Sequence, residues 1–255
     1  MSIGVFDSGL GGLWILKYLE NELPNYNFIY YADQAHLPYG TREPEEITKL
    51  SSDIVDFLLE KDCKLIVIAC NTATSASIKT LREKYDVPFV GIEPAIKPAS
   101  EQSKTGHIGV LATKVTAEGK KLEDNIEKFA SNVEVHTVIG YGLVELVEEG
   151  KGDSDEAESL LRTYLEPMLE KNLPTGQAGI DQLVLGCTHY AFLINCIKKI
   201  VGDKVNIIDP APAVVKQVIH LVRENNILPT NNKKELEIFT SGSDVNKVKE
   251  FFRSI

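Results

Sequence analysis

Short apolar segments alternate with longer amphipathic ones along the first hundred residues. The segments at 3–6 (IGVF), 28–33 (FIYYAD) and 65–70 (LIVIAC) are rich in β-branched and aromatic residues, which is typical of buried strands. Each is followed by a stretch of helical period, as at 13–23, where leucine recurs every three or four residues before Pro24 ends the pattern. Strands that alternate with helices in this way predict an α/β fold with mostly parallel sheets.

The same alternation begins again after residue 106. Strands are predicted at 107–113, 133–139 and 182–187, helices at 114–129 and 153–171, and an exposed loop at 172–179. Both halves open on Ile-Gly-Val and later carry a strand that ends in cysteine. This parallel suggests an internal duplication, with chance similarity as the alternative because Ile-Gly-Val is a common strand tripeptide. The tail adds strands and helices that the pattern alone does not assign to either half.

Composition and charge narrow the class of protein. The 255 residues, 43% hydrophobic and 25% charged, are enough for two modest globular domains. A formal net charge of -10 disfavours nucleic acid as the main partner and an anionic membrane as a binding surface. The N-terminal sequence MSIGVFDSG has no signal-peptide pattern, and no apolar run approaches the length of a spanning helix. We therefore expect a cytoplasmic protein without membrane association.

The four cysteines have neither C-x-x-C nor zinc-like spacing, so the sequence predicts free thiols, no disulfide and no metal site. For Cys63 and Cys196 we expect simple core packing, because free cysteine is commonly buried. Cys70 and Cys187 differ from them. Each ends an apolar strand segment, and side chains at the carboxyl ends of parallel strands face the ligand crevice.

A helix start directly after Cys70 and after Cys187 would favour the thiolate, because N–H groups and the helix dipole attract negative charge. Core packing remains the alternative for each of them. Residues able to hydrogen-bond a small carboxylate ligand follow both cysteines: Asn71 and Thr72 after the first, Thr188 and His189 after the second.

Two thiols that face one ligand suit inversion at a carbon bearing an acidic proton. One thiolate removes the proton from one face, and the other thiol delivers a proton to the opposite face. A single base would tend to return the proton to the face it came from. The pattern therefore favours a two-base racemase over a binding protein with purely structural cysteines.

The glycine-rich turn in VFDSGLGG does not match a nucleotide-binding loop. The G-x-G-x-x-G pattern would need glycine where Trp14 stands, and no G-K-[ST] follows, so a nucleotide-dependent enzyme is disfavoured. Asp7, at the predicted strand end, is either a helix cap or a carboxylate that orients a thiol, and Ser8 adds a hydroxyl donor.

Two further segments leave alternatives open. Tyr39 and Gly40, in LPYG, need be no more than a turn. In LVEEG, the local pattern does not decide whether Glu148 or Glu149 faces inward.

The motifs GVFDSGLGG, YYAD with LPYG, ACNTAT, LVEEG and LGCTHY together resemble glutamate racemases of the aspartate/glutamate racemase superfamily, in order over nearly the whole chain. The resemblance implies two pseudo-symmetric α/β domains facing across a cleft, formed by 1–97 plus 211–255 and by 98–210. It also implies cofactor-independent interconversion of L- and D-glutamate, which supplies D-glutamate for peptidoglycan synthesis. By analogy with the family we expect a homodimer.

The resemblance also implies roles for individual residues. Cys70 is the base that acts on D-glutamate, assisted by Asp7. Cys187 is the base that acts on L-glutamate, assisted by His189 and Glu148, which matches as the first acidic residue after Leu-Val. A core histidine is the alternative for His189. The matched substrate contacts are Asp7, Ser8, Tyr39, Gly40, Asn71, Thr72, Thr188 and His189, and Thr113 and Thr116 border the pocket.

The chain departs from the family pattern before Glu148 and after the second cysteine motif. Gly140, Tyr141 and Glu145 stand where the family has Cys-Pro and a second proline, and Ala191 stands where proline commonly follows CTHY. The loop at 172–179 is longer than usual. Since nothing precedes the first strand, regulation by a cell-wall precursor bound to an N-terminal extension is not expected. A relative acting on aspartate, hydantoins or aryl malonates is the rival interpretation.

Overall fold

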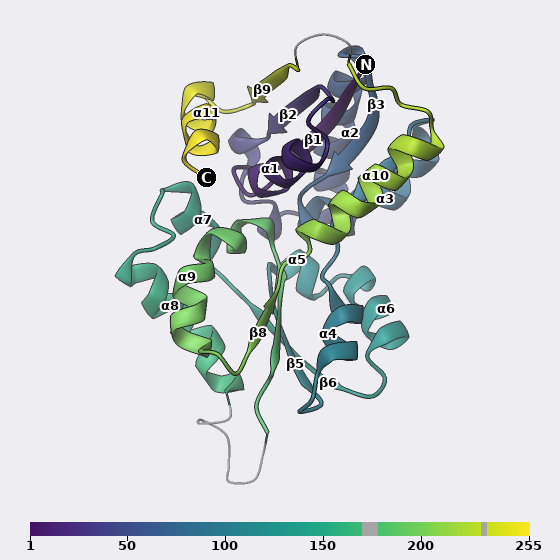
Figure 1. Ribbon diagram of the computed structural model, residues 1–255. Helices are drawn as coiled ribbons and strands as arrows, with labels where there is room; N and C mark the ends of the chain where they lie inside the picture. The colour runs from purple at the N-terminus through teal and green to yellow at the C-terminus, as the bar shows by residue number, and fades with distance from the viewer. Residues whose placement is uncertain (170–177, 231–233) are drawn as a thin grey trace. The chain divides into compact units, whose positions relative to one another are not determined.

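The computed structural model describes residues 1–169, 178–230 and 234–255, and the chain divides into two compact units. Unit 1 comprises Met1–Ile92 and Ala211–Ile255, and unit 2 comprises Glu93–Pro210. The chain therefore leaves unit 1 after one sheet is nearly complete and returns to it at α10 (Ala211–Glu224) (Figure 1). The loop predicted at 172–179 lies outside the described residues except for 178 and 179. Within the described ranges, no helix combines the length and apolarity needed to cross a bilayer.

Unit 1 contains a five-stranded parallel sheet with the strand order β4-β3-β1-β2-β9. Its strands are β1 (Ser2–Asp7), β2 (Phe28–Ala32), β3 (Cys63–Ile68), β4 (Phe89–Gly91) and β9 (Leu236–Thr240). The strands predicted from the first three apolar segments are confirmed as β1, β2 and β3. The tail supplies the edge strand β9, which pairs with β2.

Helices cover both faces of this sheet. Ile3 and Val5 of β1 pack in one core with residues of α1 (Leu13–Glu22), α10 and α11 (Val245–Ser254). The alternate residue Gly4 faces Leu58 of α2 (Pro44–Glu60), which packs beside α3 (Asn71–Lys84). Because β1 is covered on both faces, its apolar residues form a continuous run rather than an alternating one.

Unit 2 contains a four-stranded parallel sheet with the order β6-β5-β7-β8. Its strands are β5 (His107–Ala112), β6 (Glu134–Ile139), β7 (Gln182–Gly186) and β8 (Asn206–Ile208). Its α-helices are α4 (Ile96–Gln102), α5 (Lys114–Ala117), α6 (Lys120–Phe129), α7 (Leu143–Glu148), α8 (Asp155–Leu165) and α9 (Ile194–Val201). Helices α4 and α6 pack on one face, where they enclose Ile108 and Val110.

Two predicted helices in unit 2 are shorter or divided. The helix predicted over 114–129 is two helices, α5 and α6, because Gly119 adopts an extended conformation and begins α6 as its N-cap. The helix predicted over 153–171 ends as α8 at Leu165. A single turn of 3₁₀-helix, Glu166–Met168, follows it, at a proline that lacks the N–H group an α-helix interior requires.

The two sheets share one topology. In each unit the first strand in sequence lies between the second and the third, and the fourth lies beside the third. The shared order is β4-β3-β1-β2 in unit 1 and β8-β7-β5-β6 in unit 2. The two strands that precede the cysteines, β3 and β7, are therefore each hydrogen-bonded to the first strand of their own unit. This equivalence supports the internal duplication, with β9 as an addition to unit 1.

Candidate active site

Unit 1 places Cys70 at the start of α3, directly after β3. The thiol donates to Ser8 Oγ at 3.7 Å, and its sulfur accepts from the backbone N–H of Ala73 at 3.4 Å. Cys70 is thus the N-cap of a 14-residue helix, where the exposed N–H groups and the dipole favour a thiolate. The predicted helix start after this cysteine is confirmed.

The glycine-rich turn brings α1 close to the strand ends beside Cys70. Asp7, fully buried at the end of β1, accepts the N–H of Gly9 at 2.8 Å. A Cβ atom on Gly12 would lie 2.6 Å from the Cβ atom of Asp7 and 2.9 Å from that of Ala69. The glycine at position 12 therefore permits a close approach of α1 to the strand ends.

Asn71 carries the buried side-chain amide of unit 1 that is best placed to bind a ligand beside Cys70. Its side chain is 3% exposed, and in the described part of the chain neither its Oδ1 nor its Nδ2 atom has a hydrogen-bond partner. Buried amides are almost always paired, because an unpaired one loses its hydration without compensation. The amide offers both a donor and an acceptor, so its natural partner carries both as well. Thr72, also 3% exposed, follows it on α3.

Tyr39 is held by a buried carboxylate that the sequence interpretation did not select. Its hydroxyl donates to Asp33 Oδ2 at 2.6 Å, and Asp33 also accepts from the hydroxyl of Ser241 at 2.6 Å. Burial, and then the nearby charge of Asp33, raise the pKa of the Tyr39 phenol well above its ordinary value. Any contact of Tyr39 or Gly40 with an anion must then use backbone N–H groups, because the phenolic hydrogen is already donated.

Asp33 could have been recognised from its position. It ends the quoted motif YYAD at the carboxyl end of β2, next to β1 in the sheet. Carboxylates at strand ends commonly face a site. Its partner Ser241 lies 208 residues away, directly after β9, and the sequence pattern did not place this strand.

Unit 2 builds a different environment around Cys187, which follows β7. The thiol lies 3.8 Å from Nδ1 of His189, and Nε2 of the same ring lies 2.7 Å from Oε1 of Glu148, the last residue of α7. His189 is 1% exposed, so this hydrogen bond is shielded from solvent. When Nε2–H donates to the carboxylate, Nδ1 presents its lone pair to the thiol and can accept the thiol proton.

The adjacent glutamate has another partner. Glu149 forms an ion pair with Lys151 at 2.6 Å, and its side chain is 55% exposed. Glu148 is therefore the inward residue of the pair, and the open choice within LVEEG is resolved by the geometry.

A helix starts directly after Cys187, as expected, but its type differs from that of the helix after Cys70. Thr188–Leu193 form a 3₁₀-helix in which the N–H of Tyr190 bonds to the carbonyl of Cys187 at 3.1 Å, and α9 begins only at Ile194. The carbonyl of Cys70 instead accepts the N–H of Thr74, four residues further on, as in an α-helix. The expected helix start directly after Cys187 is therefore confirmed, as a 3₁₀-helix, and the imidazole of His189 lies beside the thiol there.

A glycine accounts for one departure from the family pattern. The hydroxyl of Tyr190 donates to the carbonyl of Gly140 at 3.0 Å, and a Cβ atom on Gly140 would lie only 2.7 Å from that hydroxyl oxygen. Tyr190 is fully buried, and this burial raises the pKa of its phenol. Glycine at position 140 lets this tyrosine brace the segment that leads to α7.

The remaining predicted residues of unit 2 also lie at the carboxyl ends of its strands. Thr113 follows β5, the neighbour of β7, and its hydroxyl donates to Oγ1 of Thr116 at 3.2 Å. Both threonines are buried, as is Thr188 beside Cys187. These three hydroxyls, the imidazole of His189 and the thiol of Cys187 form the polar half-site of unit 2. The motif CTHY contains no lysine or arginine.

The other two cysteines agree with core packing. Burial, with a smaller contribution from the charge of Asp62, raises the pKa of Cys63 to about 12. Cys196 is fully buried and donates to the carbonyl of Gly152 at 3.6 Å. Neither thiol lies at a strand end among donor residues.

A cavity of about 680 Å³ in unit 2 lies away from these groups. Its lining includes Asp181, Gln182 and Asn206, at the amino ends of β7 and β8, and none of the predicted site residues. In parallel α/β sheets ligands bind at the carboxyl ends of strands, so we do not regard this cavity as the substrate site.

Two parallel sheets of one topology, each with a cysteine thiol beyond the carboxyl end of a strand, are the α/β architecture expected of a racemase. The family model for Asp/Glu/Hydantoin racemases matches residues 15–218. The chain belongs to this family.

Individual relatives give the same result. A glutamate racemase of Clostridium perfringens (strain SM101 / Type A) is 43% identical over 255 residues, covering 99% of this chain and 95% of the relative. The crystal structure of glutamate racemase isoform RacE1 from Bacillus anthracis has a TM-score of 0.86 at 31% identity and covers 99% and 92% of the two chains. That of the Francisella tularensis enzyme in complex with D-glutamate has a TM-score of 0.83 at 31% identity and covers 99% and 93%. The resemblance to glutamate racemases is thereby confirmed, as is the α/β fold.

Proposed function

We propose that this protein interconverts L- and D-glutamate without a cofactor, using Cys70 and Cys187 as its two bases. The observation that carries the proposal is the buried Asn71 amide, unpaired within the described residues and adjacent to a helix-capping thiol. An α-amino acid offers a carboxylate to the amide NH₂ group and an ammonium group to the amide oxygen. An aryl malonate lacks that donor. The named relatives, which are glutamate racemases, support glutamate as the particular substrate.

In this mechanism the bond between Cα and its hydrogen breaks heterolytically. With D-glutamate, the Cys70 thiolate takes the proton and the electron pair moves into the α-carboxylate. The Cys187 thiol then donates its proton to the opposite face of Cα, which yields L-glutamate and a Cys187 thiolate. The reverse reaction exchanges the roles of the two sulfur atoms.

Each thiol has its own means of reaching the reactive protonation state. Cys70 accepts the N–H of Ala73 and stands at the helix start, while Asp7 is the carboxylate proposed to assist it. Cys187 uses the imidazole of His189, which Glu148 orients. Hydroxyls and amides then hold the substrate carboxylates, and hydrogen bonds aligned with the developing charge supply much of the stabilisation of the transition state.

The test uses L-glutamate in D₂O without added cofactor. We expect loss of optical rotation together with deuterium at Cα, the same end point from D-glutamate, and no reaction of L-aspartate. Cys70→Ser and Cys187→Ser should each abolish racemisation, whereas the buried-thiol control Cys196→Ser should keep it. Full activity in both active-site variants would instead support a binding protein with structural cysteines. Turnover of aspartate would support the rival substrate.

The wider role follows from this activity. We infer that the protein is cytoplasmic, supplies D-glutamate for peptidoglycan synthesis and forms a homodimer. Light scattering coupled to size-exclusion chromatography tests the last point, since a monomer and a dimer of a 28.2 kDa chain are readily separated in mass. Depletion of the protein, with and without D-glutamate in the medium, tests the cell-wall role.

A further inference from the structure

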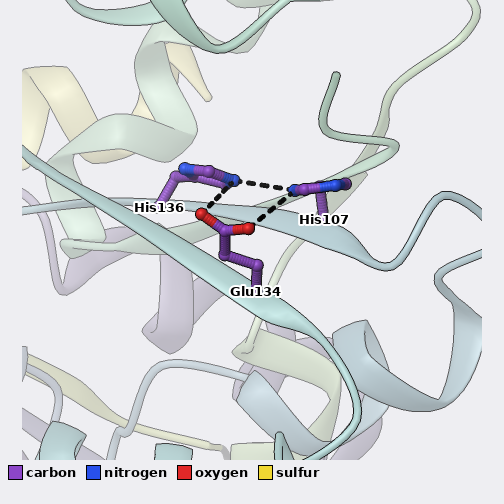
Figure 2. A group of neighbouring side chains, drawn as sticks. All are labelled: His107, Glu134 and His136. Atoms are coloured by element: carbon purple, nitrogen blue, oxygen red, sulfur yellow. Dashed lines mark hydrogen bonds and ion pairs between the residues drawn. The ribbon is translucent and has the colours of Figure 1, made fainter. Parts of the chain in front are cut away.

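Unit 2 brings together two of the chain's five histidines and a glutamate on one face of its sheet, outside the half-site. His107 begins β5, and Glu134 and His136 lie two residues apart on the neighbouring edge strand β6. The strand register pairs His107 with Glu134 and Gly109 with His136. Side chains two apart on a strand share a face, so all three project on the same side. Figure 2 shows the two rings and the carboxylate converging.

The distances describe three ligands around one centre. Nδ1 of His107 lies 3.0 Å from Nε2 of His136, and the Glu134 oxygens lie 3.6 Å from the first nitrogen and 3.8 Å from the second. The carboxylate is too far from either nitrogen for a good hydrogen bond. A simple imidazole–imidazole hydrogen bond would explain the 3.0 Å contact but not a carboxylate that flanks both nitrogens.

Metal–ligand geometry accounts for all three separations. With bonds of about 2.0–2.1 Å, two ligands of one Zn²⁺ ion are about 2.9 Å apart at right angles, about 3.3 Å at the tetrahedral angle and about 4.1 Å when opposite. The nitrogen–nitrogen separation of 3.0 Å falls within this range, as do the distances from His107 to Oε2 of Glu134, 3.6 Å, and from His136 to Oε1 of Glu134, 3.8 Å. With one ligand atom from each residue, all three atoms lie within 4.8 Å of one another. The side chains are partly open to solvent, 27% exposed for His107, 35% for His136 and 66% for Glu134, so their torsions can adjust around an ion.

We propose that His107, Glu134 and His136 form a surface site for a divalent transition-metal ion such as Zn²⁺. Two imidazole nitrogens and a carboxylate oxygen are a donor set that such ions prefer, with a fourth position open to water. The sequence expectation of no metal site rested on cysteine spacing, and it could not detect ligands that adjacent strands bring together.

The loop before β5 is already fixed by other contacts, so His107 is held in position. Asp181 accepts the hydroxyl of Ser103 at 2.8 Å and the N–H groups of Lys104 and Thr105 at 2.5 and 3.1 Å. The N–H of His107 in turn donates to Oγ1 of Thr105 at 3.2 Å.

The site is remote from the chemistry of unit 2. His107 is the first residue of the six-residue strand β5, whereas Thr113 follows its last residue, so the two are roughly 20 Å apart at about 3.3 Å per residue. A bound ion would join the starts of two strands and stabilise unit 2 rather than take part in proton transfer. The inference is therefore independent of the proposed racemase activity.

The test is calorimetric titration of the full chain with ZnCl₂. We expect one ion per chain at this site. His107→Gln and His136→Gln should each weaken Zn²⁺ binding by at least about 10-fold, since loss of a residue that only hydrogen-bonds to a metal ligand commonly lowers affinity by that much. Glu134→Gln removes a ligand that is 66% exposed, which provides a variant with little effect on packing. His220→Gln is the control, because His220 is an exposed histidine beside a glutamate, Glu224 at 3.4 Å, that belongs to no such cluster among the described residues.

Absorption spectra with Co²⁺ identify the ligands. Nitrogen and oxygen ligation gives d–d bands without a thiolate charge-transfer band, which separates this site from binding to the cysteines. The variants His107→Gln, Glu134→Gln and His136→Gln should interconvert the glutamate enantiomers at the wild-type rate. The proposal is overturned if the wild type binds no ion, if the histidine variants bind it as the wild type does, or if the Co²⁺ spectrum shows only thiolate ligation.

Discussion

Glu148→Gln tests the arrangement around Cys187 most directly. The substitution keeps the size of the side chain but removes the charge from a buried hydrogen bond of 2.7 Å to His189, whose side chain is 2% exposed. Hydrogen bonds to charged groups contribute about 1.5–3 kcal/mol. If this stabilisation applies when His189 holds the thiol proton, kcat/KM should fall by about 10- to 150-fold, at tenfold per 1.4 kcal/mol.

The loss must be the same in both directions. L- and D-glutamate have equal free energy, so the ratio of the two kcat/KM values is fixed at one for any variant. The asymmetry appears instead in the primary deuterium isotope effect. It should increase when the substrate is L-glutamate, because proton removal by Cys187 then becomes more rate-limiting. It should fall with D-glutamate, because reprotonation by Cys187 then limits the rate more than removal of the Cα proton by Cys70.

Circular dichroism of each enantiomer, with hydrogen or deuterium at Cα, measures these quantities. The control is Glu149→Gln, one residue away, whose partner is the exposed Lys151 and which should keep wild-type kinetics. Equal losses in the two variants, or a loss below threefold in Glu148→Gln, would refute the proposed role of the His189–Glu148 pair.

Three further predictions concern other parts of the molecule. Asn71→Leu should abolish activity yet raise the free energy of unfolding by about 1 kcal/mol, because it removes a buried amide that is unpaired within the described residues. A urea titration measures this change, and a less stable variant would contradict the prediction. Asp33→Asn should weaken the hold on Tyr39, raising KM and lowering stability by about 1–3 kcal/mol, whereas Tyr39→Phe should retain most of the activity if only the backbone contacts substrate. The pKa of the Cys63 thiol is raised to about 12 from an ordinary 9.0. Above about pH 9 the thiol therefore loses its proton in the unfolded chain but keeps it in the native state. The free energy of unfolding should then fall as pH rises, by at most about 1.4 kcal/mol per pH unit. Unfolding experiments from pH 8 to 10.5 should show a shallower decline for Cys63→Ala, and parallel curves would exclude this contribution.

The sequence was sufficient to predict the α/β class and most strands, because strands covered on both faces form continuous apolar runs that are easily recognised. It was less reliable where one residue interrupts a longer pattern. The amphipathic stretch at 114–129 continues across Gly119, and only the extended backbone there divides it into α5 and α6. Periodicity reports which face a residue occupies, and it does not report such a break.

Within the candidate site, Cys70, Cys187 and Asp7 were selected from the strand ends in their own segments, whereas Tyr39, Gly40 and Glu148 were selected through the resemblance to glutamate racemases. Asp33 also lies at a strand end, but its contacts with Tyr39 and with Ser241, which arrives with a distant edge strand, exist only in the folded chain. The metal-ligand cluster was missed for the same reason. His107 and His136 are 29 residues apart in sequence and become neighbours only through the register of β5 with β6.

The shared topology of the two sheets explains why both thiols follow corresponding strands, yet it did not preserve how each one is activated. Cys70 caps an α-helix and accepts an amide N–H, whereas Cys187 precedes a 3₁₀-helix and faces an imidazole held by a carboxylate. A reaction between enantiomers does not require identical bases, because the equilibrium constant fixes only the ratio of the two kcat/KM values. In the proposed mechanism the duplicated fold has to keep both thiols, while the groups around each can diverge as long as both thiols reach a usable thiolate.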